Sequence, residues 1–188
     1  MGRTKKFTDE QLWEHTKELL LQVGYDAFTV SLLAEKMNVS RAVIYKYYPN
    51  KEELVIQFML EMMNQSVAYL TEVDHTQSFR QMFHDVLTRI YQMKDLHQVL
   101  GQSVKISNVS GIVVEKKAIL SSMHNDMYKP LIFLITKGKE EGLIETGKDN
   151  FLLLSFIFSV INIPNHSEMD EQLFLNEIEQ LLLGGMIK

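Results

Sequence analysis

Two short helical segments joined by three residues constrain the fold of this chain more than any other feature of its sequence. Thr29 precedes apolar residues at the helical spacing i, i+3, i+4 and i+7, which predicts a short, capped amphipathic helix at 30–37. The residues "NVS" at 38–40 interrupt it, and a second helix begins at Arg41. That helix must be brief, because Pro49 disfavours helical geometry at the residue before it. The pattern predicts a helix-turn-helix.

The three residues between these helices suit a tight turn. Asn38 tolerates the left-handed backbone conformation that such a turn requires. Val39 can face inward from the turn, and Ser40 can cap the helix that follows. Helix-turn-helix motifs bind DNA with the first helix bracing across the backbone and the second lying in the major groove. The sequence therefore predicts a DNA-binding module, although an ordinary helical corner with packed tyrosines and solvated lysines would show the same pattern.

The second helix has one face that can anchor and another that can meet DNA. Ile44 and Tyr48 share one side. With Val39 they can anchor to Leu33 and Ala34 of the preceding helix. On the other side, an arginine can bond two guanine acceptors, small apolar residues can contact a thymine methyl group, and tyrosines and lysines can reach phosphates. The candidate DNA-binding residues are Thr29, Ser31, Ser40, Arg41, Ala42, Val43, Tyr45, Lys46, Tyr47 and Lys51.

The remaining apolar pattern predicts helices throughout, so we expect an all-α fold. Only 3 prolines and 9 glycines interrupt the 188 residues, and no strand pairing is convincing. A first helix should begin at Thr8, which forms a capping-box pattern with Gln11, and should stop at Gly24. The segment "GQSVKISNVSG" at 101–111 is the best candidate for a mobile loop. Further helices are expected at about 51–70, 77–93, 95–101, 113–124, 126–141, 149–163 and 168–184.

Charge is distributed unevenly along the chain. The formal net charge is −5, but residues 1–51 hold eight Lys or Arg against six Asp or Glu, whereas residues 52–188 hold eleven against eighteen. A basic end on an acidic body suits a protein that touches phosphate with one module only. We therefore divide the chain into a DNA-binding domain at 1–51 and a helical domain at 52–188, linked by the helix at about 51–70. The absence of cysteine excludes disulfides and is compatible with a reducing compartment.

The run "FTDEQLWEHTKELLLQVGYDAFTVSLLAEKMNVSRAVIYKYYPNKEELV" closely resembles the DNA-binding domain of the TetR family of bacterial transcriptional repressors. Within it, "GYDAFTV" resembles the entry to the second helix, and "LLAEKMNVS" resembles that helix and its turn. "IYKYYPNKEEL" resembles the family signature Tyr-x-His-Phe-x-x-Lys-x-x-Leu, in which Tyr45, Lys51 and Leu54 match. Tyr47 replaces the usual histidine and can still donate to a phosphate. Tyr48 replaces the usual phenylalanine and must place its hydroxyl at the rim of the core.

The resemblance also implies a function and an assembly. It implies an N-terminal three-helix DNA-binding domain and a C-terminal helical domain for ligand binding and dimerisation. It further implies a homodimer, a palindromic double-stranded DNA operator and a small-molecule effector. We accordingly expect a cytoplasmic, nucleoid-associated bacterial repressor that a small apolar ligand releases from DNA. The alternative is a helical interaction or adaptor protein that has lost DNA binding. An enzyme is not expected, because the sequence shows no catalytic constellation.

The end of the chain resembles the family's dimerisation region. "LIFLITKGKEEGLIETGKDNFLLLSFIFSVI" resembles the penultimate helix, its glycine break and the helix that packs against the other subunit. In the family, two late helices from each chain form a four-helix interface. The candidate interface residues are Phe151, Leu154, Phe158, Ile161, Leu173, Ile178, Leu181 and Leu182. The alternative is that they form the chain's own core. We favour the interface, because "FLLLSFIFSVI" is apolar on more sides than one subunit requires.

Methionine is frequent, with 11 residues. Flexible thioethers suit a pocket for bulky apolar ligands, although core filling is the simpler explanation for any single methionine. Taken together with nearby aromatic residues, the methionines predict an apolar effector pocket around the helix that links the two domains. The candidate pocket residues are Phe58, Met59, Met62, Met63, Phe83, Tyr91, Met93, Met123, Met127, Phe133 and Phe156.

Three weaker patterns carry no function. "GLIETGKD" at 142–149 nearly matches a phosphate-binding loop, but Asp149 stands where a hydroxyl must meet magnesium, and no strand precedes it. The six histidines show no metal-ligand spacing, so we expect no metal or other cofactor. The longest apolar run, "FLLLSFIFSVINI" at 151–163, is too short to span a bilayer, so we expect no membrane partner.

Overall fold

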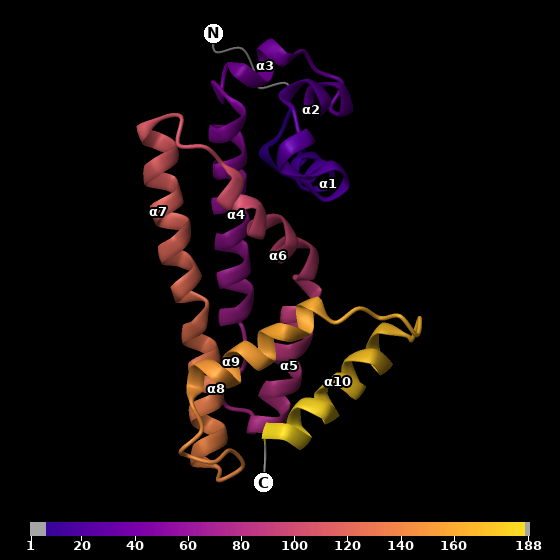
Figure 1. The fold of residues 1–188 in the computed structure, drawn as a ribbon, viewed down its shortest axis with the longest axis vertical. Helices are drawn as coiled ribbons and strands as arrows, with labels where there is room; N and C mark the ends of the chain where they lie inside the picture. The colour runs from indigo at the N-terminus through magenta and orange to yellow at the C-terminus, as the bar shows by residue number, and fades with distance from the viewer. Residues whose placement is uncertain (1–6, 187–188) are drawn as a thin grey trace. The chain divides into compact units, whose positions relative to one another are not determined.

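The computed structural model describes residues 7–186, which fold almost entirely into helices (Figure 1). No β-strand forms within this range, and the prediction of an all-α chain is confirmed. The α-helices are α1 (Asp9–Ala27), α2 (Val30–Lys36), α3 (Arg41–Tyr45), α4 (Lys51–Thr71), α5 (Phe79–Gln92), α6 (Lys94–Leu100), α7 (Gly111–Asp126), α8 (Tyr128–Glu140), α9 (Asn150–Ser159) and α10 (Glu171–Met186). Two 3₁₀ helices, η1 (Gly101–Lys105) and η2 (Val160–Asn162), follow α6 and α9.

The chain forms two compact units. One unit comprises residues 1–64 and 95–122, and the other comprises residues 65–94 and 123–188. Helix α4 therefore contributes to both units. These units describe packing, whereas the division at residue 51 into a DNA-binding and an effector domain is a prediction about function.

The first helix is capped as its sequence predicts but is bent near its end. The Thr8 hydroxyl accepts a hydrogen bond from the Gln11 amide, and the Gln11 side chain accepts one from the Thr8 amide. Gly24 interrupts the helix with φ 72° and ψ 169°, a conformation essentially restricted to glycine. Helical geometry then resumes as far as Ala27, so the predicted stop at Gly24 is a kink within α1.

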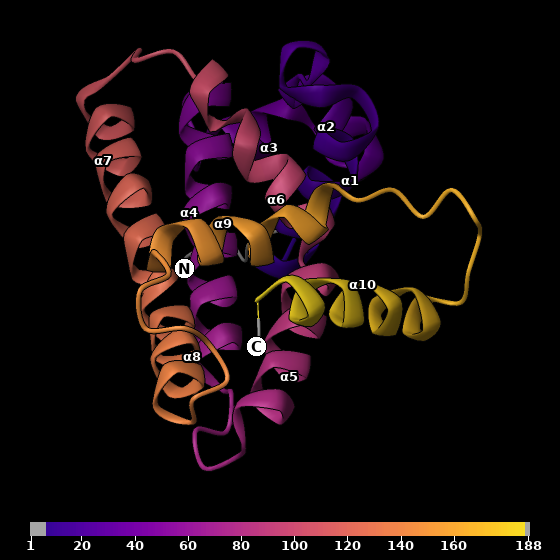
Figure 2. The same ribbon diagram turned by 60° about the horizontal axis from the view of Figure 1, so that its bottom comes forward.

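The helix-turn-helix forms with the predicted turn. Asn38 adopts φ 52°, and the Val39 amide donates to a carbonyl of α2 at 2.9 Å. Helix α3 is brief, as predicted, and ends at Tyr45, and the Tyr47 amide then bonds three residues back instead of four. Helices α1, α2 and α3 lie together in both ribbon views (Figures 1 and 2). Ile44 of α3 is fully buried, so this helix is anchored by the face that the sequence predicts.

The residues that precede α2, α3 and α4 cap these helices unequally. The Thr29 hydroxyl accepts a hydrogen bond from the Leu32 amide at 3.2 Å, and the Asn50 side chain accepts one from the Glu53 amide at 2.7 Å. Ser40 occupies the N-cap position of α3, but its side chain makes no capping hydrogen bond. The prediction that Ser40 caps this helix is therefore wrong. Packing rather than capping holds so short a helix in place.

The segment at 101–111 is only partly the loop that we expected. Its first half forms η1, and Ile106 is buried. The Lys117 ammonium donates to the Ile106 carbonyl at 2.9 Å, and the Ser110 hydroxyl donates to the Glu53 carboxylate at 3.0 Å. Residues 106–110 have no regular secondary structure, but polar groups of this stretch bond to other elements of the same unit. The mobility of this loop stays a prediction.

In the other unit, a glycine allows α5 and α8 to approach closely. A Cβ added to Gly138 would lie 2.8 Å from both the Phe79 ring and the Ile144 side chain. Real Cβ atoms almost never come so close to another heavy atom. The close packing of these two helices therefore requires the absence of a side chain at this position.

The near match to a phosphate-binding loop connects α8 to α9. Gly142 has φ 71° and ends α8, as glycine often does at a helix C-terminus. The Lys139 ammonium donates to the carbonyls of Thr146 and Lys148, at 3.2 and 2.7 Å, and to the Asn150 side chain at 2.7 Å. The loop is thus folded around a lysine of its own chain.

We expect Gly138→Ala to destabilise the protein by about 1–3 kcal/mol, because the added methyl group overpacks the contact between α5 and α8. Urea denaturation followed by circular dichroism measures this loss. Gly184→Ala is the matched control, because nothing lies within 4 Å of a Cβ at that position in α10. An equal loss of stability in both variants would contradict the close approach at Gly138.

We expect Thr29→Ala to lower the free energy of unfolding by about 1 kcal/mol, because the capping hydrogen bond of α2 is lost. Ser40→Ala should change it by less than about 0.5 kcal/mol, because the Ser40 side chain caps nothing and is exposed. The same denaturation measurement compares the two variants. A larger effect of Ser40→Ala than of Thr29→Ala would show that the two cap positions are assigned wrongly.

Candidate nucleic-acid interface

Helix α3 presents most of its predicted DNA-binding residues to solvent. Arg41, Ala42 and Lys46 are exposed, Tyr45 is 46% exposed and Val43 is half-buried. A five-residue helix is not stable on its own, so this surface exists only because the opposite face is packed against the rest of the unit. The arrangement has the geometry required of a helix that enters the major groove.

Two residues predicted to contact DNA from different helices lie close together. Nη1 of Arg41 on α3 donates to the hydroxyl of Ser31 on α2 at 3.4 Å. Both residues are exposed, and the guanidinium has further donors that this contact does not use. Thr29 differs from them, because its hydroxyl already caps α2.

Tyr47 is supported by a residue that the sequence analysis did not identify. Its ring meets the Phe7 ring edge-on with the centroids 5.9 Å apart, and the Lys46 ammonium lies 5.9 Å from the Tyr47 centroid. Phe7 is buried, although it precedes the first helix. A sequence signal for its burial exists, because an apolar residue just before an N-cap commonly packs against the fourth residue of the helix. Here the N-cap is Thr8 and the fourth residue is Leu12.

Tyr48 takes the position at the rim of the core that its replacement of phenylalanine predicts. It is half-buried and meets the Trp13 ring edge-on, with the centroids 5.8 Å apart. Trp13 in turn packs against Phe58 of α4, with the ring centroids 6.0 Å apart. Burial, and secondarily the nearby Asp9 carboxylate, raise the pKa of Tyr48, so its hydroxyl stays protonated. The residues after α3 are thus held by aromatic contacts to α1.

Lys51 does not point freely outward, as a predicted phosphate contact would. Its ammonium donates to the Tyr25 carbonyl and lies 4.0 Å from the centroid of the Tyr25 ring. Partial burial lowers the pKa of Lys51. In the DNA-free chain, this lysine therefore joins the start of α4 to the end of α1, and its assignment as a phosphate contact remains a prediction.

Tyr25 is a buried residue of this unit to which the sequence analysis gave no role. Its amide donates to the Gln102 side chain at 2.6 Å, and its hydroxyl donates to the Glu52 carboxylate at 3.5 Å. Burial, followed by the charge and the hydrogen bond of Glu52, raises the pKa of Tyr25 to about 12. No spacing rule in the sequence relates residues 25 and 102, so only the folded chain shows their contact.

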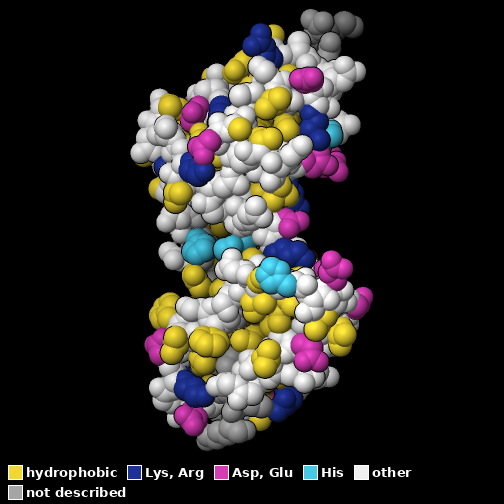
Figure 3. Space-filling model, turned by 45° about the vertical axis from the view of Figure 1, so that its right-hand side comes forward, with side chains coloured by type: hydrophobic (Ala, Val, Ile, Leu, Met, Phe, Trp, Pro, Cys, Tyr) yellow, Lys and Arg dark blue, Asp and Glu magenta, His cyan; other side chains and the backbone are white. Residues whose placement is uncertain are grey.

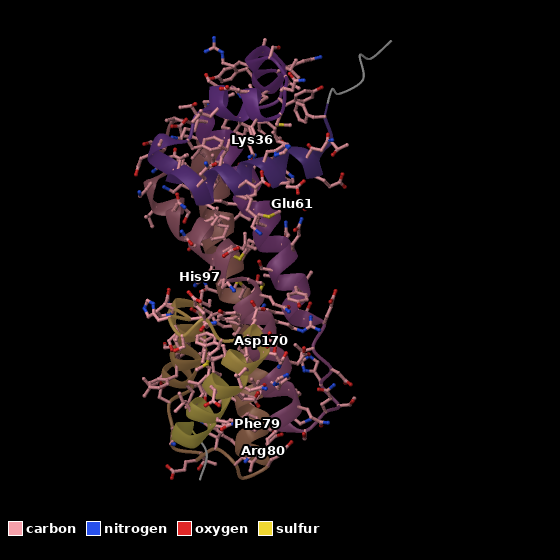
Figure 4. The ribbon with its side chains drawn as sticks, turned by 90° about the vertical axis from the view of Figure 1, so that its right-hand side faces the viewer. Lys36, Glu61, Phe79, Arg80, His97 and Asp170 are labelled. Carbon is pink, nitrogen blue, oxygen red and sulfur yellow. The ribbon has the colours of Figure 1, made fainter. Side chains whose placement is uncertain are left out.

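The lysine of α2 is neutralised by α1. The ammonium of Lys36, labelled in Figure 4, lies 3.1 Å from the Glu18 carboxylate, which also contacts His15 at 3.2 Å. The hydrogen bonds from Lys36 and His15 lower the pKa of Glu18. Arg41 and Lys46 are exposed cations of α3 and its C-cap.

The predicted pocket residues divide by burial. The buried members are Phe58, Met59, Met62, Met63, Phe83, Tyr91 and Met127, and the half-buried members are Met93 and Met123. Phe133 and Phe156 are exposed, at 44% and 56%, so these two do not line an enclosed site within one chain. Phe156 lies on the outward side of α9, which the sequence could not distinguish because this helix is apolar all round.

The predicted interface residues also divide. The exposed members are Phe151, at 66%, Leu173, at 51%, and Leu181, at 77%. Leu154, Ile178 and Leu182 are buried within the single chain, so the alternative that we considered, the chain's own core, applies to them. Phe158 and Ile161 are half-buried. Figure 3 shows hydrophobic side chains gathered on the visible face of the unit that contains α9 and α10.

Two other kinds of site find no support among residues 7–186. This part of the chain contains no group of three or more His, Cys, Asp or Glu residues that could hold a metal ion. None of its helices is long and apolar enough to cross a bilayer.

Comparison with known proteins extends the match at the helix-turn-helix. A family model described as "Bacterial regulatory proteins, tetR family" matches residues 12–58, which include α2, α3 and most of α1. The chain is 22% identical over 187 residues to the fatty acid metabolism regulator protein of Bacillus subtilis, and the alignment covers 94% of each chain.

Solved structures show the same fold over nearly the whole chain. A bacterial regulatory protein in the tetR family from Rhodococcus RHA1 has a TM-score of 0.79 at 19% identity, covering 96% of this chain and 98% of that one. The fatty acid degradation regulator FadR from Bacillus halodurans has a TM-score of 0.70 at 21% identity, with the same coverage. The helix-turn-helix, the family match over residues 12–58 and these relatives show that the chain resembles the TetR family of transcriptional regulators in its DNA-binding region and in its fold.

Proposed function

We propose that the protein is a repressor that binds a palindromic operator as a homodimer and is released by a small apolar ligand. The observation that carries this proposal is the exposed polar face of α3. The opposite face of the same helix is anchored by Ile44, which is fully buried. Such a helix can enter a groove without losing its support. A protein with this function acts in the bacterial cytoplasm, on the nucleoid.

Within this proposal, Arg41 contacts a base and Ala42 and Val43 meet thymine methyl groups. Lys46 and the hydroxyls of Tyr45 and Tyr47 contact phosphates, which fixes the register of α3 in the groove. Thr29, Ser31 and Ser40 contact the backbone beside them, and Lys51 does so if it leaves Tyr25. Base contacts from so short a helix specify few base pairs, so a second copy of the chain is needed for a specific site.

The exposed apolar residues of α9 and α10 support the dimer. Phe151, Leu173 and Leu181 are each more than half exposed in the single chain, and Leu152, which follows Phe151 in α9, is 61% exposed. Large apolar side chains exposed on two late helices favour association with another protein surface. In a homodimer, two copies of α3 would lie about 34–36 Å apart, one turn of DNA.

The names of the relatives support an apolar effector. One relative is named as a regulator of fatty acid metabolism and one structural neighbour as a regulator of fatty acid degradation. We propose a fatty acid, or a molecule of similar apolarity, as the ligand of this chain, with the buried aromatic residues Phe83 and Tyr91 of α5 among its contacts. Release then follows from a population shift, because the ligand binds more tightly to a conformation that does not fit DNA.

We expect the purified chain to select duplexes with an inverted repeat from a random-sequence pool, and a long-chain fatty acid to lower their retention. Arg41→Ala should weaken binding to the selected duplex by roughly tenfold to a hundredfold, because a bidentate base contact is lost. Fluorescence anisotropy with labelled duplex measures the affinity.

The control for this experiment is Arg80→Ala, which removes one exposed positive charge from α5 (Figure 4). If the two substitutions weaken binding to the duplex equally, Arg41 contributes only nonspecific positive charge. Failure of the wild-type chain to retain any duplex would overturn DNA binding and favour the adaptor function. A fatty acid without effect on retention would overturn the proposed ligand class.

We expect Leu181→Glu to convert the homodimer to a monomer, with the dissociation constant raised roughly hundredfold or more, because the carboxylate would be buried without a partner in the interface. Sedimentation analysis measures the association state. The control is Ile119→Glu, at a residue of α7 that is 44% exposed. A monomeric wild-type chain at micromolar concentration, or loss of the dimer in both variants, would contradict the proposed interface.

A further inference from the structure

We propose that Gln102 on η1 is a positioning residue for DNA binding, which holds the kink of α1 in the geometry that directs the chain into the helix-turn-helix. This inference rests on the proposed DNA-binding function. The residues predicted to contact DNA all lie between positions 29 and 51, so Gln102 would act through other residues and not by touching DNA.

Gln102 bridges the kink by bonding to backbone groups on both sides of it. Its Oε1 accepts a hydrogen bond from the Tyr25 amide at 2.6 Å, and its Nε2 donates to the Leu20 carbonyl at 3.3 Å. Gly24 interrupts the helical hydrogen-bond ladder between these residues, and backbone groups at such an interruption need other partners. A carboxamide suits this position, because it offers an acceptor and a donor on the same side chain.

Tyr25 transmits this contact to the start of α4. Its carbonyl accepts the hydrogen bond from Lys51, its hydroxyl donates to Glu52, and its ring lies beneath the Lys51 ammonium. Tyr25 is 5% exposed, so these partners surround a residue with little freedom to move. The hydrogen bond from the Tyr25 amide to Gln102 therefore holds one side of Tyr25, and contacts with α4 hold the other.

The residues from the kink at Gly24 to Phe28 set the direction of the DNA-binding helices. The chain passes from Tyr25 to Phe28, which is fully buried and whose amide donates to the Gly24 carbonyl at 3.0 Å. Thr29 follows directly and caps α2. Helix α3 packs against α2. A shift of residues 24–28 therefore moves the surface that is proposed to meet DNA. Both copies of α3 must fit successive grooves, which makes binding sensitive to such a shift.

An ion pair between η1 and α1 does not substitute for Gln102. The Lys105 ammonium contacts the Asp26 carboxylate, but these side chains are 48% and 74% exposed. Exposed ion pairs contribute little to stability and are screened by salt. The hydrogen bonds of the half-buried Gln102 side chain therefore define the geometry of the kink.

The test uses the full chain and a duplex that the wild-type protein selects from a random-sequence pool. Gln102→Met preserves the length of the side chain and removes both hydrogen bonds. We expect it to weaken binding to the duplex roughly tenfold, to accelerate hydrogen exchange of the Tyr25 amide, and to leave the unfolding transition cooperative. Gln102→Glu keeps the acceptor for the Tyr25 amide but loses the donor to Leu20, so it should lose less affinity than Gln102→Met. Gln98→Met, at an exposed position of α6, is the matched control and should behave as the wild type.

The possible outcomes separate the inference from the proposed function. If the wild type binds the duplex and Gln102→Met binds equally well, the inference is overturned and the proposed function stands. If Gln102→Met loses affinity only in proportion to its unfolded fraction, Gln102 has a structural role only and the inference is overturned. If the wild type retains no duplex, both the proposed function and this inference are overturned.

Discussion

Burial of one side of α3 is the interaction on which the rest of the DNA-binding unit depends. The helix has only five residues, and a helix of that length does not persist in water. Ile44 is completely removed from solvent, and Tyr48 just beyond the helix packs against Trp13. These apolar contacts hold the polar side in a fixed orientation. The chemistry of the exposed residues matters only because the buried ones prevent the helix from unfolding or rotating.

A second constraint is the kink at Gly24, where polar rather than apolar contacts control the geometry. Partly buried polar groups must be paired, and here the partners of Tyr25 come from η1 on one side and α4 on the other. This arrangement explains why η1, directly after α6, packs against α1. A glutamine and a lysine that look like surface residues in the sequence therefore determine the path of the chain into α2.

The C-terminal helices illustrate a different limit of sequence reasoning. Their positions along the chain follow from the apolar pattern, and the structure contains a helix in each predicted region. The pattern on α9 is nearly uniform, so it cannot show which side faces the core. Phe156 was expected inside and is exposed, whereas Leu154 was expected on a surface and is buried. The difference depends on how neighbouring helices cover α9, which is a property of the fold.

The sequence by itself determined the helical class, the helix-turn-helix, its left-handed turn at Asn38 and the identity of the exposed residues on α3. These features depend on local spacing, caps and backbone preferences, which act over a few residues. Only the tertiary structure decided that Lys51 binds Tyr25, that Gln102 spans the kink of α1, and which apolar residues of α9 and α10 remain exposed. Those contacts join residues far apart in the chain, and a side chain's polarity or size does not specify its distant partner.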